Sequence, residues 1–397
     1  MNSAKLIILA AACITGVGAI LGYAWSRGRQ AVPHAPRVTQ SSQQNPATVV
    51  TPLQPQRQPQ TAATHVNALR NTVRLAEANM NVGRMARPET TAAEHARLEA
   101  ETLEQKLVDS MARLTEQLSK DPGSVKDAIA LLEAESDPAL MTLLAQAIGQ
   151  AADAMGDKFP YDSLLKMALN DPSQDKRRAA LTALGYMSKI PTELQQQVAE
   201  ISRNAPSNEL RIAAVECLGA WMSKNPALKQ TISETLLATR VANEDAAVRG
   251  IAIQTIGNQD TPLSRKVFEA MADAVVHEVA PHNRSLAALA LGGGVGPENR
   301  EAILSTLEAA YLGEANLDTQ RHLITQIAKA ARYDAEDYLG RLPTPHPLLA
   351  QDIKDYVEIL ASADRKDWGA IWDQKSNRDH ERGTYPGSHG GHDTDDH

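Results

Sequence analysis

A short pattern that returns at regular intervals constrains the fold of this chain more than any other feature. Four nine-residue segments begin with Arg and end with Gly, and small or branched apolar residues fill most of the space between. The segments are RRAALTALG (177–185), RIAAVECLG (211–219), RGIAIQTIG (249–257) and RSLAALALG (284–292). Successive glycines lie 34, 38 and 35 residues apart. A period near 35 residues holds one helical hairpin, so the pattern predicts a series of helical hairpins.

Weaker copies extend the pattern in both directions. MTLLAQAIG ends at Gly149, 36 residues before Gly185, and RHLITQIA ends at Ala328, 36 residues after Gly292. In the last copy, Gln320 and Arg321 are shifted by one position. Partner helices such as TELQQQVAEISR lie between these segments, and loops such as NDPSQD and NQDTP supply Pro and Asn stops. We therefore expect about six hairpins over residues 121–363.

The repeats resemble HEAT repeats, including the short bacterial forms grouped with phycobilin-lyase-like repeats. HEAT repeats commonly carry Asp six residues before the Arg. Asp171 matches, and the equivalent positions hold Ala205, Asn243 and Glu278. The resemblance implies a right-handed α-solenoid, in which each hairpin is stable only when stacked on its neighbours.

The recurring Arg and Gly are predicted to be structural. The resemblance implies that each Arg bonds its preceding loop and an acidic residue of its own or the next repeat. Each Gly allows a close helix contact or a C-cap turn. These structural positions are Arg177, Gly185, Arg211, Gly219, Arg249, Gly257, Arg284 and Gly292.

Composition favours an all-α fold. Aromatic residues make up only 4% of the chain, with 2 Phe, 4 Trp and 8 Tyr. Apolar volume must therefore come from Ala, Leu, Ile, Val and Met, which suit helices packed closely through small side chains.

The amino-terminal region predicts a membrane anchor within residues 1–25. Residues 6–25 (LIILAAACITGVGAILGYAW) contain no charge and, at 1.5 Å per residue, would span about 30 Å. A cleaved signal peptide and a lipoprotein modified at Cys13 are alternatives. The anchor predicts a single-pass protein of the bacterial inner membrane with a periplasmic body, and a cytoplasmic body is the alternative.

Two further segments separate the anchor from the repeats. Residues 26–62 are rich in Pro and Gln without apolar periodicity, which predicts a disordered linker. Residues 63–120 contain two helical stretches divided at Pro88. The apolar stripe of the second stretch predicts either a cap on the first repeat or a coiled coil that forms a homodimer through residues 90–119.

The carboxyl-terminal region predicts a short amphipathic helix over 364–373 and a disordered tail over 374–397. Trp368, Ile371 and Trp372 share one face of that helix, so they are candidates for closing the last repeat or for binding a partner. The tail contains weak metal-ligand candidates without the spacing of a defined site. These are His380, His389, His392 and His397.

The charge distribution and the residue types narrow the function. The first 76 residues hold seven Lys and Arg and no acidic residue, which leaves 33 basic and 48 acidic residues for the remainder. An acidic body is a poor nucleic-acid binder. The repeats show no convergent catalytic set, so we predict a non-enzymatic, membrane-tethered scaffold or adaptor without a cofactor that binds another protein in an envelope complex. The alternative is a lyase-like or other enzyme with a small ligand in the concave groove.

Overall fold

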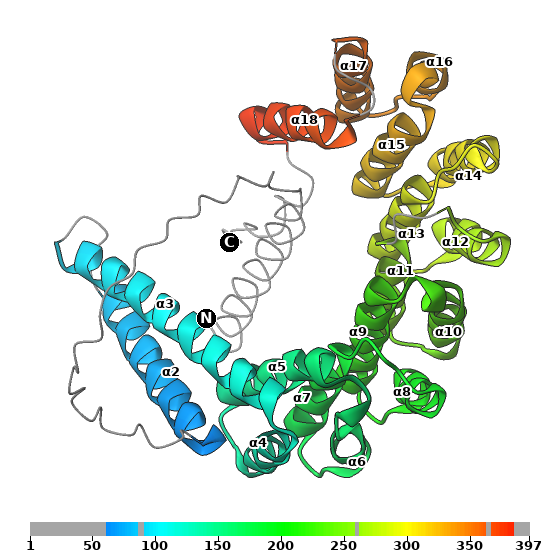
Figure 1. Ribbon diagram of the computed structural model, residues 1–397. Helices are drawn as coiled ribbons and strands as arrows, with labels where there is room; N and C mark the ends of the chain where they lie inside the picture. Colours follow the sequence, from blue (N-terminus) through cyan, green and yellow to red (C-terminus); the bar gives the residue numbers. More distant parts are fainter. Residues whose placement is uncertain (1–60, 86–90, 259–261, 363–366, 385–397) are drawn as a thin grey trace, which may run out of the picture. The chain divides into compact units, whose positions relative to one another are not determined.

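The computed structural model describes residues 61–85, 91–258, 262–362 and 367–384. Within these residues every regular element is a helix, so the predicted all-α class is confirmed (Figure 1). The chain divides into two units, 1–61 and 62–397, and the described helices all belong to the second. The predicted anchor at 1–25 and nearly all of the predicted linker at 26–62 lie outside the described residues.

The predicted localisation, a single-pass protein of the bacterial inner membrane, requires correction. No helix of the described residues is long and apolar enough to cross a bilayer. The two longest, α2 (Ala62–Met85) and α3 (Thr91–Lys120), carry charged residues along their length. This finding contradicts the predicted localisation. The segment 6–25 itself lies outside the described residues.

Six helical hairpins follow one another along the described chain. We call the second helix of each hairpin a core helix and the first a flanking helix. The hairpins are α4–α5 (Pro122–Ala134, Pro138–Met155), α6–α7 (Tyr161–Asn170, Gln174–Gly185), α8–α9 (Thr192–Asn204, Asn208–Lys224), α10–α11 (Lys229–Ala242, Ala246–Gly257), α12–α13 (Arg265–His277, Pro281–Gly293) and α14–α15 (Arg300–Gly313, Leu317–Ala331). After them come α16 (Ala335–Leu339), α17 (Pro347–Ser362) and α18 (Trp368–Arg382).

Most core helices begin with a side chain that caps the first turn. In each case a carboxylate, amide or hydroxyl oxygen accepts a hydrogen bond from a backbone N–H of that turn. The caps are Asp137, Ser173, Ser207, Asp245 and Asn316. Such a cap contributes about 1 kcal/mol and sets the residue at which the core helix starts.

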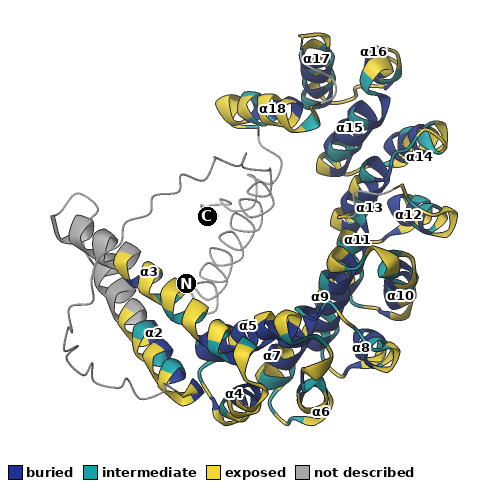
Figure 2. Ribbon diagram, viewed as in Figure 1, coloured by how far each residue is buried: buried dark blue, intermediate teal, exposed yellow. Residues whose placement is uncertain are grey.

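The core helices pack against one another in chain order. α5 contacts α7, α7 contacts α9, and the series continues through α11 and α13 to α15. The segments ending at Gly185, Gly219, Gly257 and Gly292 therefore lie side by side. Figure 2 shows buried residues concentrated along these helices, and Leu184 and Leu218 are fully buried. The hydrophobic core thus runs from hairpin to hairpin.

Several of the recurring glycines lie where the next core helix approaches most closely. A Cβ placed on Gly257 would lie 2.9 Å from Cβ and 3.0 Å from Cα of Ala290 on α13. At Gly185 the nearest atoms of α9 would be 3.5 Å away, an ordinary van der Waals distance. Close helix contact, and not a left-handed turn, therefore explains Gly257.

The first two described helices cover the start of this series. α2 and α3 pack on each other, and they contact α4 and α5, respectively. Leu114 and Leu118 of the predicted apolar stripe are fully buried within the chain. Arg70 of α2 donates to Glu135, at the end of α4, over 2.7 Å. This packing is the arrangement expected of a cap.

The carboxyl-terminal boundary was predicted incorrectly. The amphipathic helix was expected to end at residue 373, but α18 continues to Arg382 and is capped by Gly383 in the left-handed conformation. Residues 374–382 therefore belong to a helix and not to a disordered tail. Lys375 and Asp379 are buried there, because charged residues of α15 and α17 pair with them.

Replacing Gly257 by Ala is expected to lower the free energy of unfolding by about 1 to 3 kcal/mol, because the added methyl group would overlap the backbone of α13. Gly185→Ala is the matched control. It has room for a methyl group and should leave stability unchanged or raise it by up to about 1 kcal/mol through helix propensity. Urea denaturation of both variants measures the difference. Equal effects would contradict the close-contact explanation.

Candidate binding cleft

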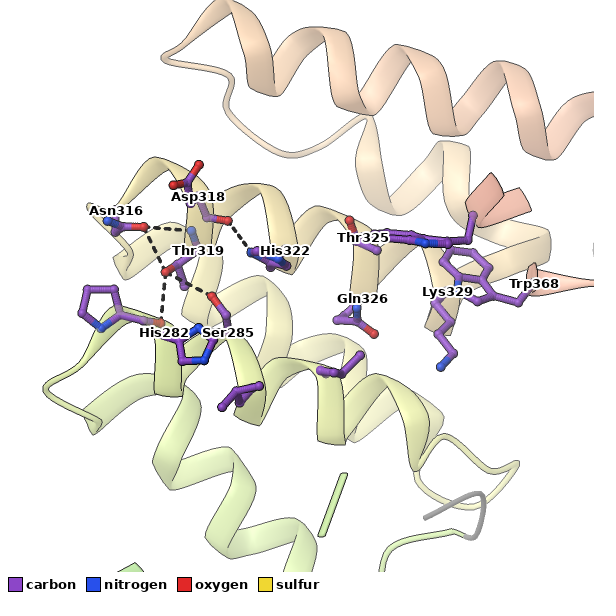
Figure 3. Close-up of a pocket in the computed structure, with 14 residues that line it drawn as sticks. His282, Ser285, Asn316, Asp318, Thr319, His322, Thr325, Gln326, Lys329 and Trp368 are labelled. Atoms are coloured by element: carbon purple, nitrogen blue, oxygen red, sulfur yellow. Dashed lines mark hydrogen bonds between the residues drawn. The ribbon is translucent and has the colours of Figure 1, made fainter. Parts of the chain in front are cut away.

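A cleft of about 630 Å³ lies where α13, α15 and the start of α18 meet (Figure 3). Its lining mixes apolar and polar side chains from all three helices and from the residue that caps α15. From α13 come Pro281, His282, Ser285, Leu286 and Leu289; from α15 and its cap come Asn316, Asp318, Thr319, His322, Thr325, Gln326 and Lys329; and from α18 come Trp368 and Trp372.

Hydrogen bonds organise the polar side chains at one end of the cleft, as Figure 3 shows. Asn316 Oδ1 accepts from the Thr319 backbone N–H over 2.9 Å, which starts α15 at this position. The Thr319 hydroxyl donates to the Pro281 carbonyl over 3.2 Å, and the Ser285 hydroxyl donates to Thr319 Oγ1 over 3.3 Å. These bonds join the first turns of α13 and α15.

Gln326 is a buried polar residue of this cleft. Only 4% of its surface is exposed, and its Oε1 atom has no hydrogen-bond partner among the described residues. Its amide packs against Gly292, where a Cβ would lie 2.2 Å from Oε1. The recurring glycine at 292 therefore makes room for the Gln326 side chain.

The tryptophans of α18 form the wall at the other end. Trp368 stacks on Tyr356 of α17, with ring centroids 6.0 Å apart and an interplanar angle of 10°. Trp372 is 37% exposed. Ile371, predicted with them as a partner-binding candidate, is fully buried, because it faces the interior while the tryptophans border the cleft. Of the three candidates, Trp368 and Trp372 line the cleft.

Tyr356 links this wall to α15. Its hydroxyl donates to Thr325 Oγ1 over 3.0 Å, and Thr325 in turn donates to the Arg321 carbonyl. Burial raises the pKa of Tyr356, since the charged phenolate would lose its hydration. Tyr356 therefore remains a neutral hydrogen-bond donor. Its bond to Thr325 fixes the Tyr356 ring in the position where Trp368 stacks on it.

A largely buried group of charged residues, which we call the charge cluster, holds α18 against α15 and α17. Arg321 donates to Asp352 over 2.7 Å, and Lys375 lies 2.8 Å from Asp352 and 2.5 Å from Asp379. The complete cluster contains Arg321, Asp352, Asp355, Lys375, Arg378, Asp379 and Arg382.

The three carboxylates of the charge cluster are close enough to share a cation. One oxygen from each of Asp352, Asp355 and Asp379 lies within 4.8 Å of the others. Positively charged side chains already lie beside them, including Lys375 and Arg382, which is 2.5 Å from Asp355. The cluster therefore has the chemistry of an ion-pair network that docks a helix, and its carboxylates need no metal for charge balance.

Burial opposes ionisation of Asp355, but hydrogen bonds from Arg382, Gln351 and Arg378 hold the pKa of Asp355 below its usual range. Asp355 is fully buried at the α17–α18 contact. Its negative charge therefore stabilises the docked position of α18 whenever the carboxylate is ionised.

The recurring arginines connect consecutive hairpins by an arrangement that we call the arginine ladder. Arg211 donates to the Ala205 carbonyl, six residues earlier, over 2.7 Å, and to Asn243 Oδ1 of the next hairpin over 3.0 Å. Arg284 likewise donates to the Glu278 carbonyl and forms a two-point pair with Glu314 at 2.6 and 2.7 Å. The side chain that receives each arginine therefore belongs to the next hairpin.

The same geometry occurs at Arg249, which donates to Glu278 over 3.0 Å. Burial raises the pKa of Glu278, but hydrogen bonds from Arg240 and Arg249 outweigh it and hold this pKa below its usual range. In the last hairpin, Gln320 donates to the Glu314 carbonyl over 2.9 Å, which leaves Arg321 for the charge cluster. In an earlier hairpin, Arg211 bonds both the loop before its helix and a side chain of the next hairpin. In the last hairpin these two roles fall to different residues, because Gln320 bonds the loop and Arg321 bonds Asp352.

A rung of the arginine ladder consists of one recurring arginine and the side chain of the next hairpin that accepts its hydrogen bond. The rung of Arg177 is incomplete. The residue that should receive it is Ala205, at the end of α8, which has no polar side chain. Nε of Arg177 is buried without a partner among the described residues. Ala205 has φ −59° and ψ 147°, close to the −62° and 132° of Glu278, so the backbone already suits an acidic residue.

The metal-ligand candidates of the tail are not brought together by the described residues. His380 is exposed on α18. His389, His392 and His397 lie outside the described residues.

Sequence reasoning identified the tryptophans but not the α13 and α15 residues of the cleft. Gln326 stands at a position that the helical spacing of apolar residues predicts to be buried. A polar residue at such a position is the signal that could have marked it as a candidate site residue. Similarly, Lys375 and Asp379 are four residues apart on one helix face. Only their burial distinguishes them from an exposed pair.

No protein-family model matches this chain, and no curated protein has a significantly similar sequence. Function is therefore inferred from the cleft and from the packing of the helices alone.

Ala205→Glu is expected to raise the free energy of unfolding by about 1 kcal/mol, because a carboxylate at this position would complete the rung with Arg177. Urea denaturation measures the change. The control is the same substitution in an Arg177→Gln background, where the gain should disappear. A gain of equal size in both backgrounds would rule out pairing with Arg177.

Asp355→Asn is expected to lower the free energy of unfolding by about 3 kcal/mol at pH 7, because the buried Lys375 and the partly exposed Arg378 and Arg382 would lose a charged partner that is itself fully buried. The folded-state pKa of Asp355 is depressed, so its contribution is present above the unfolded value of about 4 and is lost as pH falls through the folded value. The deficit of the variant should therefore shrink below about pH 4.

The measurement is urea denaturation at several pH values between 7 and 3. Asp373→Asn, at an exposed position on the same helix, is the control and should change stability little at any pH. A deficit for Asp355→Asn that is constant across this range would contradict an electrostatic role.

Proposed function

We propose that this protein is a HEAT-like, right-handed α-solenoid of about six hairpins that acts as a non-enzymatic scaffold or adaptor. It binds another protein through the cleft between α13, α15 and α18. The observation that carries this proposal is apolar surface left exposed in the cleft: Leu289 is 39% and Trp372 is 37% exposed. Burying such side chains provides binding energy, and Trp is frequent among the residues that dominate protein interfaces.

The packing of the hairpins supports the solenoid part of the proposal. Each core helix between α7 and α13 contacts the core helix before it and the one after it. The arginine ladder ties the end of one hairpin to the end of the next through bonds such as Arg284 to Glu314. Stacked units of this kind present long surfaces to other proteins.

A small-ligand enzyme on the same repeats has less support from the cleft. The hydroxyls of Ser285 and Thr319 bond to each other and to a backbone carbonyl, and not to a histidine or carboxylate that would activate them. His322 Nδ1 lies 2.8 Å from the Asp318 carbonyl, so this nitrogen carries a proton and donates. The bonds of Ser285 and Thr319 hold α13 against α15, and the His322 bond lies within α15.

The proposal is tested by placing a photo-reactive phenylalanine at position 289 or 312 in cells that produce the protein. Leu312 is 61% exposed on α14, outside the cleft, and provides the matched control. We expect a discrete crosslinked protein from position 289 and not from 312. Adding Trp372→Ala should reduce its yield about tenfold or more. Equal crosslinking from both positions, or none from 289, would contradict the proposal.

A further inference from the structure

We infer that α18 is a detachable wall of the cleft. It leaves α15 and α17 as one unit while the hairpins stay folded, and the cleft is complete only while α18 is docked. Docking of α18 and binding of a partner at the cleft therefore strengthen each other. This coupling rests on the proposed protein-binding function, whereas the detachment of α18 does not.

The face of α18 that meets the rest of the chain has little apolar surface. Three residues of this helix are buried, and only Ile371 among them is apolar; the other two are Lys375 and Asp379. Trp368 adds its stack on Tyr356. By contrast, the core helix α9 buries nine residues, none of them charged. Because apolar burial is the main favourable term in folding, α18 is held much less strongly than a core helix.

Charge complementarity supplies the rest of the attachment. Three basic residues of α18 surround Asp355 of α17: Lys375 lies 3.8 Å from it, Arg378 3.2 Å and Arg382 2.5 Å. In a buried pair, the loss of hydration offsets much of the attraction between the charges. When α18 leaves, water reaches Asp355 and the basic groups at the same time. The pairs therefore fix where α18 docks but add little to how tightly it is held.

The helices that α18 leaves behind remain joined to each other. Arg321 of α15 donates to Asp352 of α17 over 2.7 Å, and this bond does not involve α18. Tyr356 of α17 donates to Thr325 of α15 over 3.0 Å, again without α18. Because α15 and α17 keep these bonds, detachment stops at α18 and does not continue into the hairpins.

Both ends of α18 are fixed, so the helix opens as a unit. At its start, Trp368 stacks on Tyr356. At its end, Gly383 caps the helix in the left-handed conformation, and Arg321 donates to the Thr384 carbonyl over 2.6 Å. Fraying from the last turn would break these end contacts while the charge cluster still held the middle. The end contacts and the charge cluster are instead lost together.

Detachment removes the tryptophan wall of the cleft, formed by Trp368 and Trp372. These are the residues that α18 contributes to the lining, and the others belong to α13, α15 and the cap of α15. A partner that contacts the tryptophans binds only the docked state, so its apparent affinity falls in proportion to the docked fraction. Breaking the charge cluster should therefore weaken binding even though no residue of the lining is changed.

Hydrogen–deuterium exchange of the full chain at pH 7, followed by mass spectrometry, tests the detachment. Amides in the middle and last turn of α18 should exchange about a hundredfold or more faster than those of α9, and they should share one opening rate. Equal protection of α18 and α9 would overturn the inference. Protection that decreases steadily toward Arg382 would indicate fraying and would also overturn it.

Lys375→Glu places a fourth carboxylate beside Asp352, Asp355 and Asp379. It should speed exchange of α18 by about a hundredfold and leave α9 unchanged, because docking would bury unpaired negative charge. The matched control is Gln374→Glu, which adds a negative charge at the neighbouring exposed position and should change neither helix. Equal acceleration of α18 and α9 would show that α18 does not open separately, and no acceleration of α18 would show that the charge cluster does not hold it; either result overturns the inference.

Photo-crosslinking from position 289 tests the coupling to partner binding. Lys375 does not line the cleft, yet Lys375→Glu should lower the crosslink yield about tenfold or more, and Gln374→Glu should not. An unchanged yield in Lys375→Glu would overturn the coupling. If position 289 of the unmodified chain captures no protein, the proposed function fails, whereas separate exchange of α18 would still establish its detachment.

Discussion

The need to cover both sides of each core helix is the constraint on which the rest of this structure depends. A core helix such as α9 carries Leu218 and Val215, both fully buried, and packs against α7 on one side and α11 on the other. Close approach is required at Gly257, where a methyl group has no room beside Ala290. A hairpin removed from this series would expose its apolar faces, so stability is shared between neighbours.

A series of this kind has two ends, and the structure closes them by different chemistry. At the start, α2 and α3 cover the first hairpin largely with apolar residues such as Leu114 and Leu118. At the other end, the charge cluster attaches α18 through buried pairs such as Lys375 with Asp352. Buried ion pairs specify geometry closely because a misplaced charge is left without a partner. The same helix carries Trp368 and Trp372, so the closure of the repeats also builds one wall of the cleft.

Local patterns explain why much of the helical organisation was predictable. The Arg-to-Gly segments place apolar residues at helical spacing, and capping residues such as Ser207 and Asp245 mark where core helices begin. The end of α18 was not predictable in this way. Its residues 374–382 are polar, and they are ordered by the pairs of Asp379 with Arg321 and of Lys375 with Asp352, whose partners are distant in sequence. Similarly, the buried amide oxygen of Gln326, which has no partner among the described residues, is recognisable only when its neighbours are known.

By itself the sequence determined the all-helical class, the period of the hairpins and the residues that recur in them, because helix propensity, capping and apolar spacing act within one or two turns. Tertiary structure alone decided which hairpin receives each arginine, why Nε of Arg177 is buried without an acceptor, and how three helices assemble the cleft that Gln326 lines. These outcomes depend on contacts between residues about 30 or more positions apart. Such contacts form only when the apolar faces of successive helices have been brought together.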